Sequence, residues 1–98
     1  MKLVMENRTG YGYSMDNPVK ANGPMMSYSY IKSLRPEEGV VVAWYRDYSA
    51  RCKKTNRIVD RYSIYVLPSE NATELKQYCI FVDMYNNHTD VSTPMDFD

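Results

Sequence analysis

The chain has 98 residues, in which 12 Lys and Arg balance 12 Asp and Glu, and its mean hydropathy is −0.56. This length indicates one domain with a small core. The zero net charge gives no bulk electrostatic reason to bind a polyanion, and the lack of a long apolar run excludes a membrane span. Ten tyrosines against two phenylalanines, with few glycines and prolines, are typical of half-buried sheet faces rather than of a disordered chain.

The first third of the sequence predicts an extended segment followed by a helix. Residues 1–9 are expected to be loose, and the alternation of glycine with tyrosine over residues 10–13 favours an extended backbone. Pro24 suits the first turn of a helix. The apolar positions that follow it with helical spacing are Met26, Tyr30 and Leu34. We therefore expect a short amphipathic helix over residues 25–34.

Three later segments carry strand signals. Residues 40–48 are β-branched and aromatic, and residues 57–67 alternate between apolar and polar positions. Residues 78–85 form a mostly apolar run that indicates a buried strand. Residues 69–76 leave two readings open, a helical turn capped by Ser69 or an extended segment.

This order of elements predicts an α+β fold, a small antiparallel meander of three to four strands with one short helix packed on one face. Residues 1–86 would form the single domain. Residues 87–98, which contain Pro94 and three aspartates but no Lys or Arg, are expected to be a flexible acidic tail. The core residues expected between sheet and helix are Tyr30, Ile31, Leu34, Tyr62, Ile64, Val66, Ile80, Val82 and Met84.

Motifs of the common enzyme classes are missing from the sequence. The single histidine, His88, falls in the expected tail, and the adjacent Glu37 and Glu38 lie on a turn. No GxSxG, HExxH or phosphate-binding GxxxxGK[ST] sequence occurs. Two cysteines and one histidine at scattered spacing cannot form a tetrahedral zinc site. We expect a protein that is not an enzyme and that needs no metal or cofactor.

The two cysteines, Cys52 and Cys79, bear on the compartment of the protein. The start of the chain lacks the apolar run of a signal peptide, which predicts a cytoplasmic protein with both thiols reduced. A leader that had been removed would instead place the protein in the cell envelope. One disulfide between the two cysteines would then stabilise it.

The neutral total hides an uneven distribution of charge. Residues 46–67 contain six basic and two acidic residues, and residues 68–98 contain one basic and six acidic residues. In the basic stretch the cations alternate with aromatic residues, a pattern that single-stranded nucleic-acid surfaces use. Solvated charges at the tip of a hairpin are the simpler interpretation. The acidic tail could fold back onto this basic loop.

The favoured hypothesis is a non-enzymatic module whose exposed tyrosines and basic hairpin contact a protein partner, because Tyr and Arg anchor such interfaces. Binding of single-stranded nucleic acid by the same hairpin is the alternative. Association of identical chains through an edge strand stays open. The residues assigned to partner binding are Tyr11, Tyr13, Trp44, Arg46, Tyr48, Arg51, Lys53, Lys54 and Arg57.

Short motifs within residues 10–86 resemble those of one bacterial family. They are Gly12-Tyr13-Ser14, Asn17-Pro18-Val19-Lys20, Gly23-Pro24 at the start of the helix, Asp60-Arg61-Tyr62, and Asp83-Met84-Tyr85 at the end of the last strand. The pattern resembles small uncharacterised proteins of the Bacteroides type, many of them lipoproteins behind a signal peptide. The resemblance implies a single sheet-and-helix module and carries over no catalytic residue. The start of the sequence shows neither the leader nor the lipidated cysteine typical of that family, which favours the expected cytoplasmic location over the cell envelope.

Overall fold

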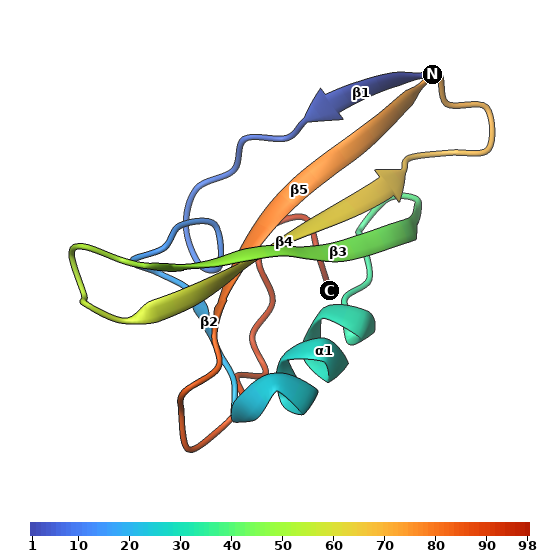
Figure 1. The fold of residues 1–98 in the computed structure, drawn as a ribbon. Helices are drawn as coiled ribbons and strands as arrows, with labels where there is room; N and C mark the ends of the chain where they lie inside the picture. Colours follow the sequence, from blue (N-terminus) through green and yellow to red (C-terminus); the bar gives the residue numbers. More distant parts are fainter.

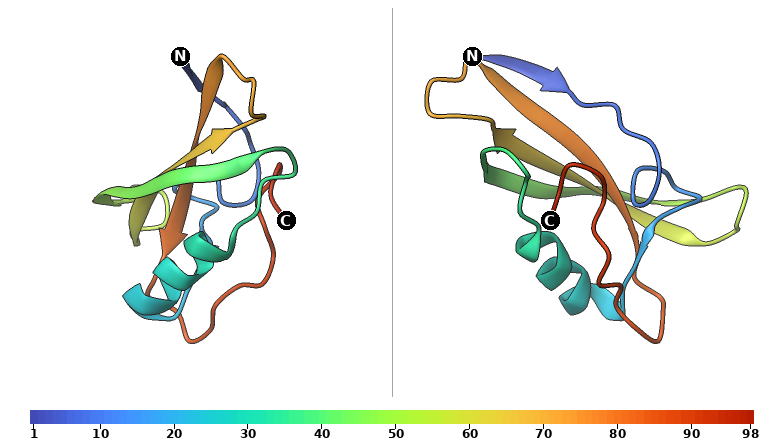
Figure 2. Two further views of the ribbon diagram at one scale, coloured as in Figure 1. Left: turned by 90° about the vertical axis from the view of Figure 1, so that its right-hand side faces the viewer. Right: turned by 180° about the vertical axis from the view of Figure 1, so that it is seen from behind.

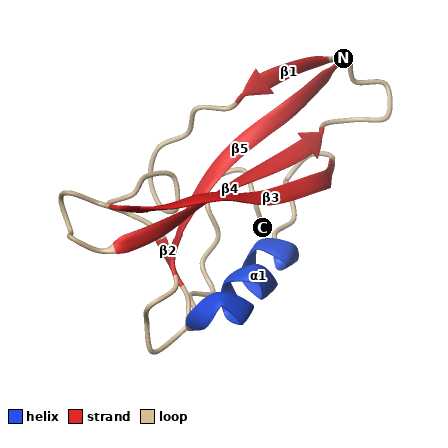
Figure 3. Cartoon of the chain, viewed as in Figure 1, coloured by secondary structure: helices blue, strands red, loops and turns tan.

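The computed structural model describes residues 1–98 as one sheet with a helix and the C-terminal segment against the same face (Figures 1 and 2). Figure 3 shows the single helix beside the strands. The elements in chain order are β1 (Lys2–Met5), β2 (Val19–Lys20), α1 (Gly23–Ser33), β3 (Val40–Arg51), β4 (Ile58–Leu67) and β5 (Glu74–Asp83).

The sheet is built around β5, with the strand order β1-β5-β4-β3. β4 pairs antiparallel with both β3 and β5, whereas β1 and β2 pair parallel with opposite ends of β5. The predicted α+β class, with one short helix and a mostly antiparallel sheet, is confirmed. The expected strand number is wrong, because the sheet has five strands.

The two additional strands are too short to leave a pattern in the sequence. β1 has four residues and β2 has two, and each is defined by its pairing with β5. Between them, Glu6 N–H donates to the carbonyl of Gln77 and Phe81 N–H donates to the carbonyl of Gly12, both at 2.8 Å, so the connecting segment also contacts this edge at these two points. Residues 1–9, which were expected to be loose, therefore begin with a sheet strand. In the segment left open, residues 69–72 form a turn, and β5 begins at Glu74.

Helix α1 confirms the predicted helix, although it begins two residues earlier. Pro24 lies in its first turn, and Ser27, Tyr30 and Ile31 are its buried residues. After the helix, the backbone of Leu34 is extended, which ends the helical hydrogen-bond pattern. Its 11 residues fall short of the long apolar helix needed to cross a membrane.

The core lies between the sheet and α1 and includes eight of the nine predicted residues. Met84 is the exception and is only half-buried, because β5 ends at Asp83 and the alternation of faces stops there. Besides the predicted residues, the core cluster contains Val19, Ala21, Tyr78 and Phe97. The core therefore draws on both ends of the chain as well as on the central strands.

The C-terminal segment packs against the domain and does not form a tail outside it. Phe97 is 4% exposed, and its ring lies edge-on to that of Tyr78, with 5.0 Å between the centroids. The hydroxyl of Tyr30 donates to the carbonyl of Ser92 at 2.6 Å. Figure 2 shows the segment beside α1 on the same side of the sheet. An apolar ring placed three residues after a proline was too weak a signal to predict this packing.

Candidate functional site

The loop between β3 and β4, residues 52–57, carries three of the six basic residues of the hairpin and is closed by backbone hydrogen bonds. Cys52 N–H donates to the carbonyl of Arg57 at 2.8 Å, and Asn56 N–H donates to the carbonyl of Cys52 at 2.7 Å. Asn56 has a φ of 60°, in the left-handed region that asparagine tolerates better than most residues. Cys52 is buried under the loop, and both cysteines are free thiols. The loop therefore has a defined shape.

Most cations of the basic hairpin are neutralised within the molecule. Only Arg51 and Lys53 lack a carboxylate within the 4.0 Å distance of an ion pair. The four pairs are Arg46–Asp60 at 3.2 Å, Lys54–Asp16 at 3.0 Å, Arg61–Asp47 at 3.8 Å and Arg57–Asp83. The strong basic surface expected from the sequence is therefore reduced to two unpaired cations.

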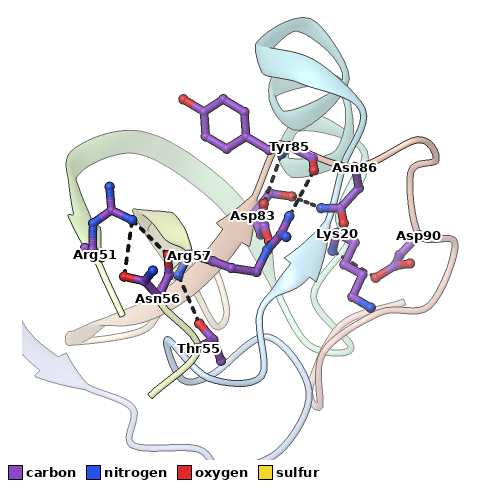
Figure 4. Close-up of polar contacts among 9 residues, drawn as sticks. All are labelled: Lys20, Arg51, Thr55, Asn56, Arg57, Asp83, Tyr85, Asn86 and Asp90. Carbon is purple, nitrogen blue, oxygen red and sulfur yellow. Dashed lines mark hydrogen bonds and ion pairs between the residues drawn. The ribbon is translucent and has the colours of Figure 1, made fainter. Parts of the chain in front are cut away.

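Asp83 anchors the loop end of this hairpin, as Figure 4 shows. Its carboxylate is buried and accepts hydrogen bonds from Arg57 Nε and, at 3.0 Å, from the backbone N–H of Tyr85. Burial tends to raise the pKa of Asp83, but the bonds from Arg57 and Tyr85 outweigh it and hold the pKa below its ordinary value. Arg57 also donates to the carbonyl of Tyr85 at 2.9 Å. The pair thus ties the hairpin to the end of β5.

The carboxylates of residues 87–98 do not reach the basic loop. Asp90 accepts a hydrogen bond from the hydroxyl of Tyr11 at 2.7 Å, and Asp96 accepts one from Arg8 Nε at 2.8 Å. The C-terminal segment is therefore held by the N-terminal part of the chain. The expectation that it folds onto the hairpin is wrong.

Two of the tyrosines assigned to partner binding instead hold the C-terminal segment. Tyr11 and Tyr13 are half-buried against the core, and Tyr13 donates its hydroxyl hydrogen to the carbonyl of Met95. Burial, together with the hydrogen bond to Asp90, raises the pKa of Tyr11. Their rings and hydroxyls are thus engaged in packing, and Tyr13 also lines a pocket together with Tyr48 and Arg61 of the hairpin.

The other two aromatic candidates lie on opposite faces of β3. Trp44 is half-buried on the core side, where its ring packs near those of Tyr28 and Tyr62. Tyr48 is exposed, and the guanidinium of Arg61 lies 5.6 Å from its ring centroid. The nine predicted residues therefore do not form one surface.

The identity of the free sheet edge is the main feature that could not be predicted from the sequence. β3 is 12 residues long and pairs with β4 only, so its other side has no strand partner. The side chains of Val40, Val42 and Tyr45 are exposed along this strand. Irregularities between Val41 and Ala43 and between Arg46 and Tyr48 interrupt the pairing register.

An apolar groove runs between this edge and the C-terminal end of α1. It has a volume of about 390 Å³, and seven of its nine lining residues are hydrophobic. We call it the α1–β3 groove. Its lining residues are Ile31, Lys32, Leu34 and Arg35 on the helix side and residues 41–45 of β3.

Two cations without a counter-ion line the α1–β3 groove. Lys32 and Arg35 are exposed, and neither has a carboxylate within ion-pair distance. The guanidinium of Arg35 donates to the backbone carbonyls of Lys32 and Leu34 at 3.1 and 3.3 Å. The groove therefore combines apolar walls with uncompensated positive charge. The apolar run of residues 40–45 was a visible signal, but its edge position was not.

Comparison of the chain with family models, with curated proteins and with solved structures finds no match. The resemblance to the Bacteroides-type family stays a prediction. No three His, Cys, Asp or Glu side chains gather closely enough to hold a metal ion. The function is therefore inferred from the geometry of the chain itself.

Proposed function

We propose that the protein is a non-enzymatic module that binds an extended segment of a partner protein in the α1–β3 groove. The segment would add to the sheet as a strand beside β3. The observation that carries the proposal is that an unpaired sheet edge and an apolar groove occur side by side. In this mode of recognition, backbone hydrogen bonds provide affinity and pockets for alternate side chains provide specificity.

The bulges of β3 favour a short segment over a second copy of the chain. Residues 43–46 form the regular run between the two register shifts, and residues 41–45 line the groove. Bulges bend an edge and limit its pairing with a long flat strand, which is how sheets avoid edge-to-edge association. A partner strand of about four residues can therefore pair without crossing a bulge.

The charges of the groove specify the chemistry of the segment. Lys32 and Arg35 carry positive charge that no carboxylate of this chain compensates. Complementary charges across an interface increase specificity and the rate of association. We expect a segment with alternating apolar residues flanked by Asp or Glu.

Selection from a random-peptide display library, followed by calorimetric titration with the enriched peptides, tests this proposal. We expect acidic, alternating apolar sequences, and slower hydrogen exchange at the amides of residues 43–46 in the complex. Val42→Glu places a negative charge at the edge, and this charge would repel the acidic residues of the expected segment. The substitution should weaken binding at least about tenfold, or about 1.4 kcal/mol.

The matched control is Leu3→Glu on β1, because Leu3 is 53% exposed and Val42 is 52% exposed. This variant should bind the peptides as the parent does, and both variants should unfold at nearly the parent temperature. Equal loss in the two variants, or no enriched peptide, would contradict the proposal. A dimer of the free protein that Val42→Glu dissociates would identify a second copy as the occupant and overturn it.

The nucleic-acid alternative receives less support from the contacts of the hairpin. A strand of nucleic acid needs a row of cations along its phosphates. The hairpin leaves only Arg51 and Lys53 without a carboxylate partner. Its other four cations are paired with carboxylates of the same chain.

A further inference from the structure

A second depression lies at the base of the hairpin loop, at the opposite end of β3 from the α1–β3 groove. Its volume is about 410 Å³, within the range of small-molecule sites. Figure 4 shows the contacts among most of its polar residues. The lining residues are Arg51, Asn56, Arg57, Ile58 and Tyr85.

Arg51 presents a fixed guanidinium with unused donors to this depression. Its NH1 group donates to the carbonyl of Asn56 at 2.8 Å and lies 3.4 Å from the side-chain oxygen of the same residue. Its Nε and second NH2 group make no hydrogen bond, and no carboxylate pairs with it. A planar guanidinium with open N–H groups matches the oxygens of a phosphate.

Tyr85 presents an aromatic ring to the same depression. Its backbone is held at both polar groups, the N–H by Asp83 and the carbonyl by Arg57. Its side chain is 59% exposed, and its ring has no aromatic partner. Figure 4 shows the ring projecting away from the Arg57–Asp83 pair. A fixed backbone with a free ring is a platform on which a flat ligand ring can stack.

We propose that this depression binds a ligand of the nucleoside monophosphate class, with the phosphate on Arg51 and the base stacked on Tyr85. Arg57 contributes one guanidinium face, but Asp83 neutralises its charge. Beyond Arg51, only Lys53 adds an unpaired cation from the hairpin. The site can therefore compensate the negative charge of one phosphate group, which favours a mononucleotide over a strand of nucleic acid.

Titration of the isotopically labelled protein with adenosine monophosphate, adenosine and inorganic phosphate, followed by NMR, tests the proposal. We expect saturable shifts of the Tyr85 ring and Arg51 Nε–H signals with the monophosphate. Stacking of a base on an aromatic ring should make it bind roughly tenfold more tightly than phosphate alone. Adenosine alone should bind more weakly than the monophosphate because it lacks the contact to Arg51.

Two variants separate the two contacts. Arg51→Gln should abolish binding of both phosphate and the monophosphate, whereas Tyr85→Ala should retain phosphate and lose the roughly tenfold preference. The matched controls are Lys54→Gln, a paired cation of the same loop, and Tyr45→Ala, another exposed tyrosine. Both should leave the binding of the monophosphate unchanged.

Equal affinity for phosphate and the monophosphate would overturn the assignment of Tyr85, and unchanged binding by Arg51→Gln would overturn the site. An oligoadenylate that binds far more tightly than the monophosphate, with steep salt dependence, would show that a strand is the ligand and also overturn the proposal. The site does not depend on the peptide-binding proposal. Val42→Glu should leave monophosphate binding unchanged, so failure of one proposal is distinguishable from failure of the other.

Discussion

The two halves of β3 differ in whether the cations near them are paired with carboxylates. Around the first half, residues 40–45, the chain is mostly apolar, yet Lys32 and Arg35 are uncompensated. Around the second half and its loop, residues 46–57, the chain is rich in basic residues, yet most of them are paired with carboxylates. A segment's content of charged residues is therefore a poor guide to the charge that it offers a ligand.

The difference follows from what the fold brings beside each half. The tip half lies near the end of β5 and the loop before β2, which supply Asp83 and Asp16. The groove half lies beside the last turn of α1, where the structure brings no carboxylate within ion-pair distance of Lys32. Each half can be perturbed separately.

The largest effect is expected from Phe97→Ala, which tests how far the groove half depends on the C-terminal segment. Phe97 is buried against Tyr78, and the backbone next to it pairs with Arg35 beside the groove. Removing the ring should cost about 3–5 kcal/mol of unfolding free energy in urea. The control Met95→Ala, at an exposed position, should change it by less than about 0.5 kcal/mol. A cost for Phe97→Ala as small as that of the control would show that the segment is not part of the core.

A smaller effect is expected from Asp83→Asn, which releases the tip half. The buried carboxylate accepts hydrogen bonds from Arg57 and from the backbone N–H of Tyr85. The amide of asparagine has one oxygen and no charge, so it can replace only part of these interactions. Because Arg57 is half-exposed and solvent screens the pair, we expect a loss of about 1 kcal/mol at neutral pH.

The same substitution should change the dependence of stability on pH. The pKa of Asp83 is lowered in the folded protein, so its contribution is present above the unfolded value of about 3.9. That contribution is lost as the pH falls through the folded pKa. In urea unfolding at a series of pH values, the difference between parent and variant should shrink as the pH falls below about 4. A constant difference would show that the carboxylate charge does not matter there.

The smallest effect is expected from Lys54→Gln, which removes an exposed ion pair of the tip half. Lys54 and its partner Asp16 lie at the surface, where solvent screening and side-chain entropy offset the attraction. The unfolding midpoint in urea should not change measurably. A clear destabilisation would mean that even exposed pairs of the hairpin hold the fold, which would strengthen the contrast with the groove half.

Long, regular elements were predictable from the sequence, and short ones were not. The helical spacing around Tyr30, the alternation of residues 57–67 and the apolar run of residues 78–85 identified α1, β4 and the end of β5. These patterns repeat over several turns or pleats, so local information is sufficient. β1, β2 and the position of Phe97 depend on pairing and packing with distant segments, and no local pattern records that dependence.

The candidate site was less predictable than the fold. Trp44 was the predicted residue that lines the α1–β3 groove, whereas Lys32, Arg35 and the open edge of β3 were missed. Tyr11 was assigned to partner binding because tyrosine is common at interfaces. Its apolar ring and polar hydroxyl suit it equally well to hold the C-terminal segment, where the hydroxyl donates to Asp90. Residue type alone does not distinguish these roles.

By itself, the sequence determined the class of fold, the helix, the three long strands and most of the core, because apolar periodicity is a local property. Only the tertiary structure decided which cations are free and which sheet edge is open. The pairs Lys54–Asp16 and Arg57–Asp83 join residues 38 and 26 positions apart, and the edge position of β3 depends on every other strand. Most cations of the basic stretch in this neutral chain therefore form ion pairs with carboxylates of the same chain.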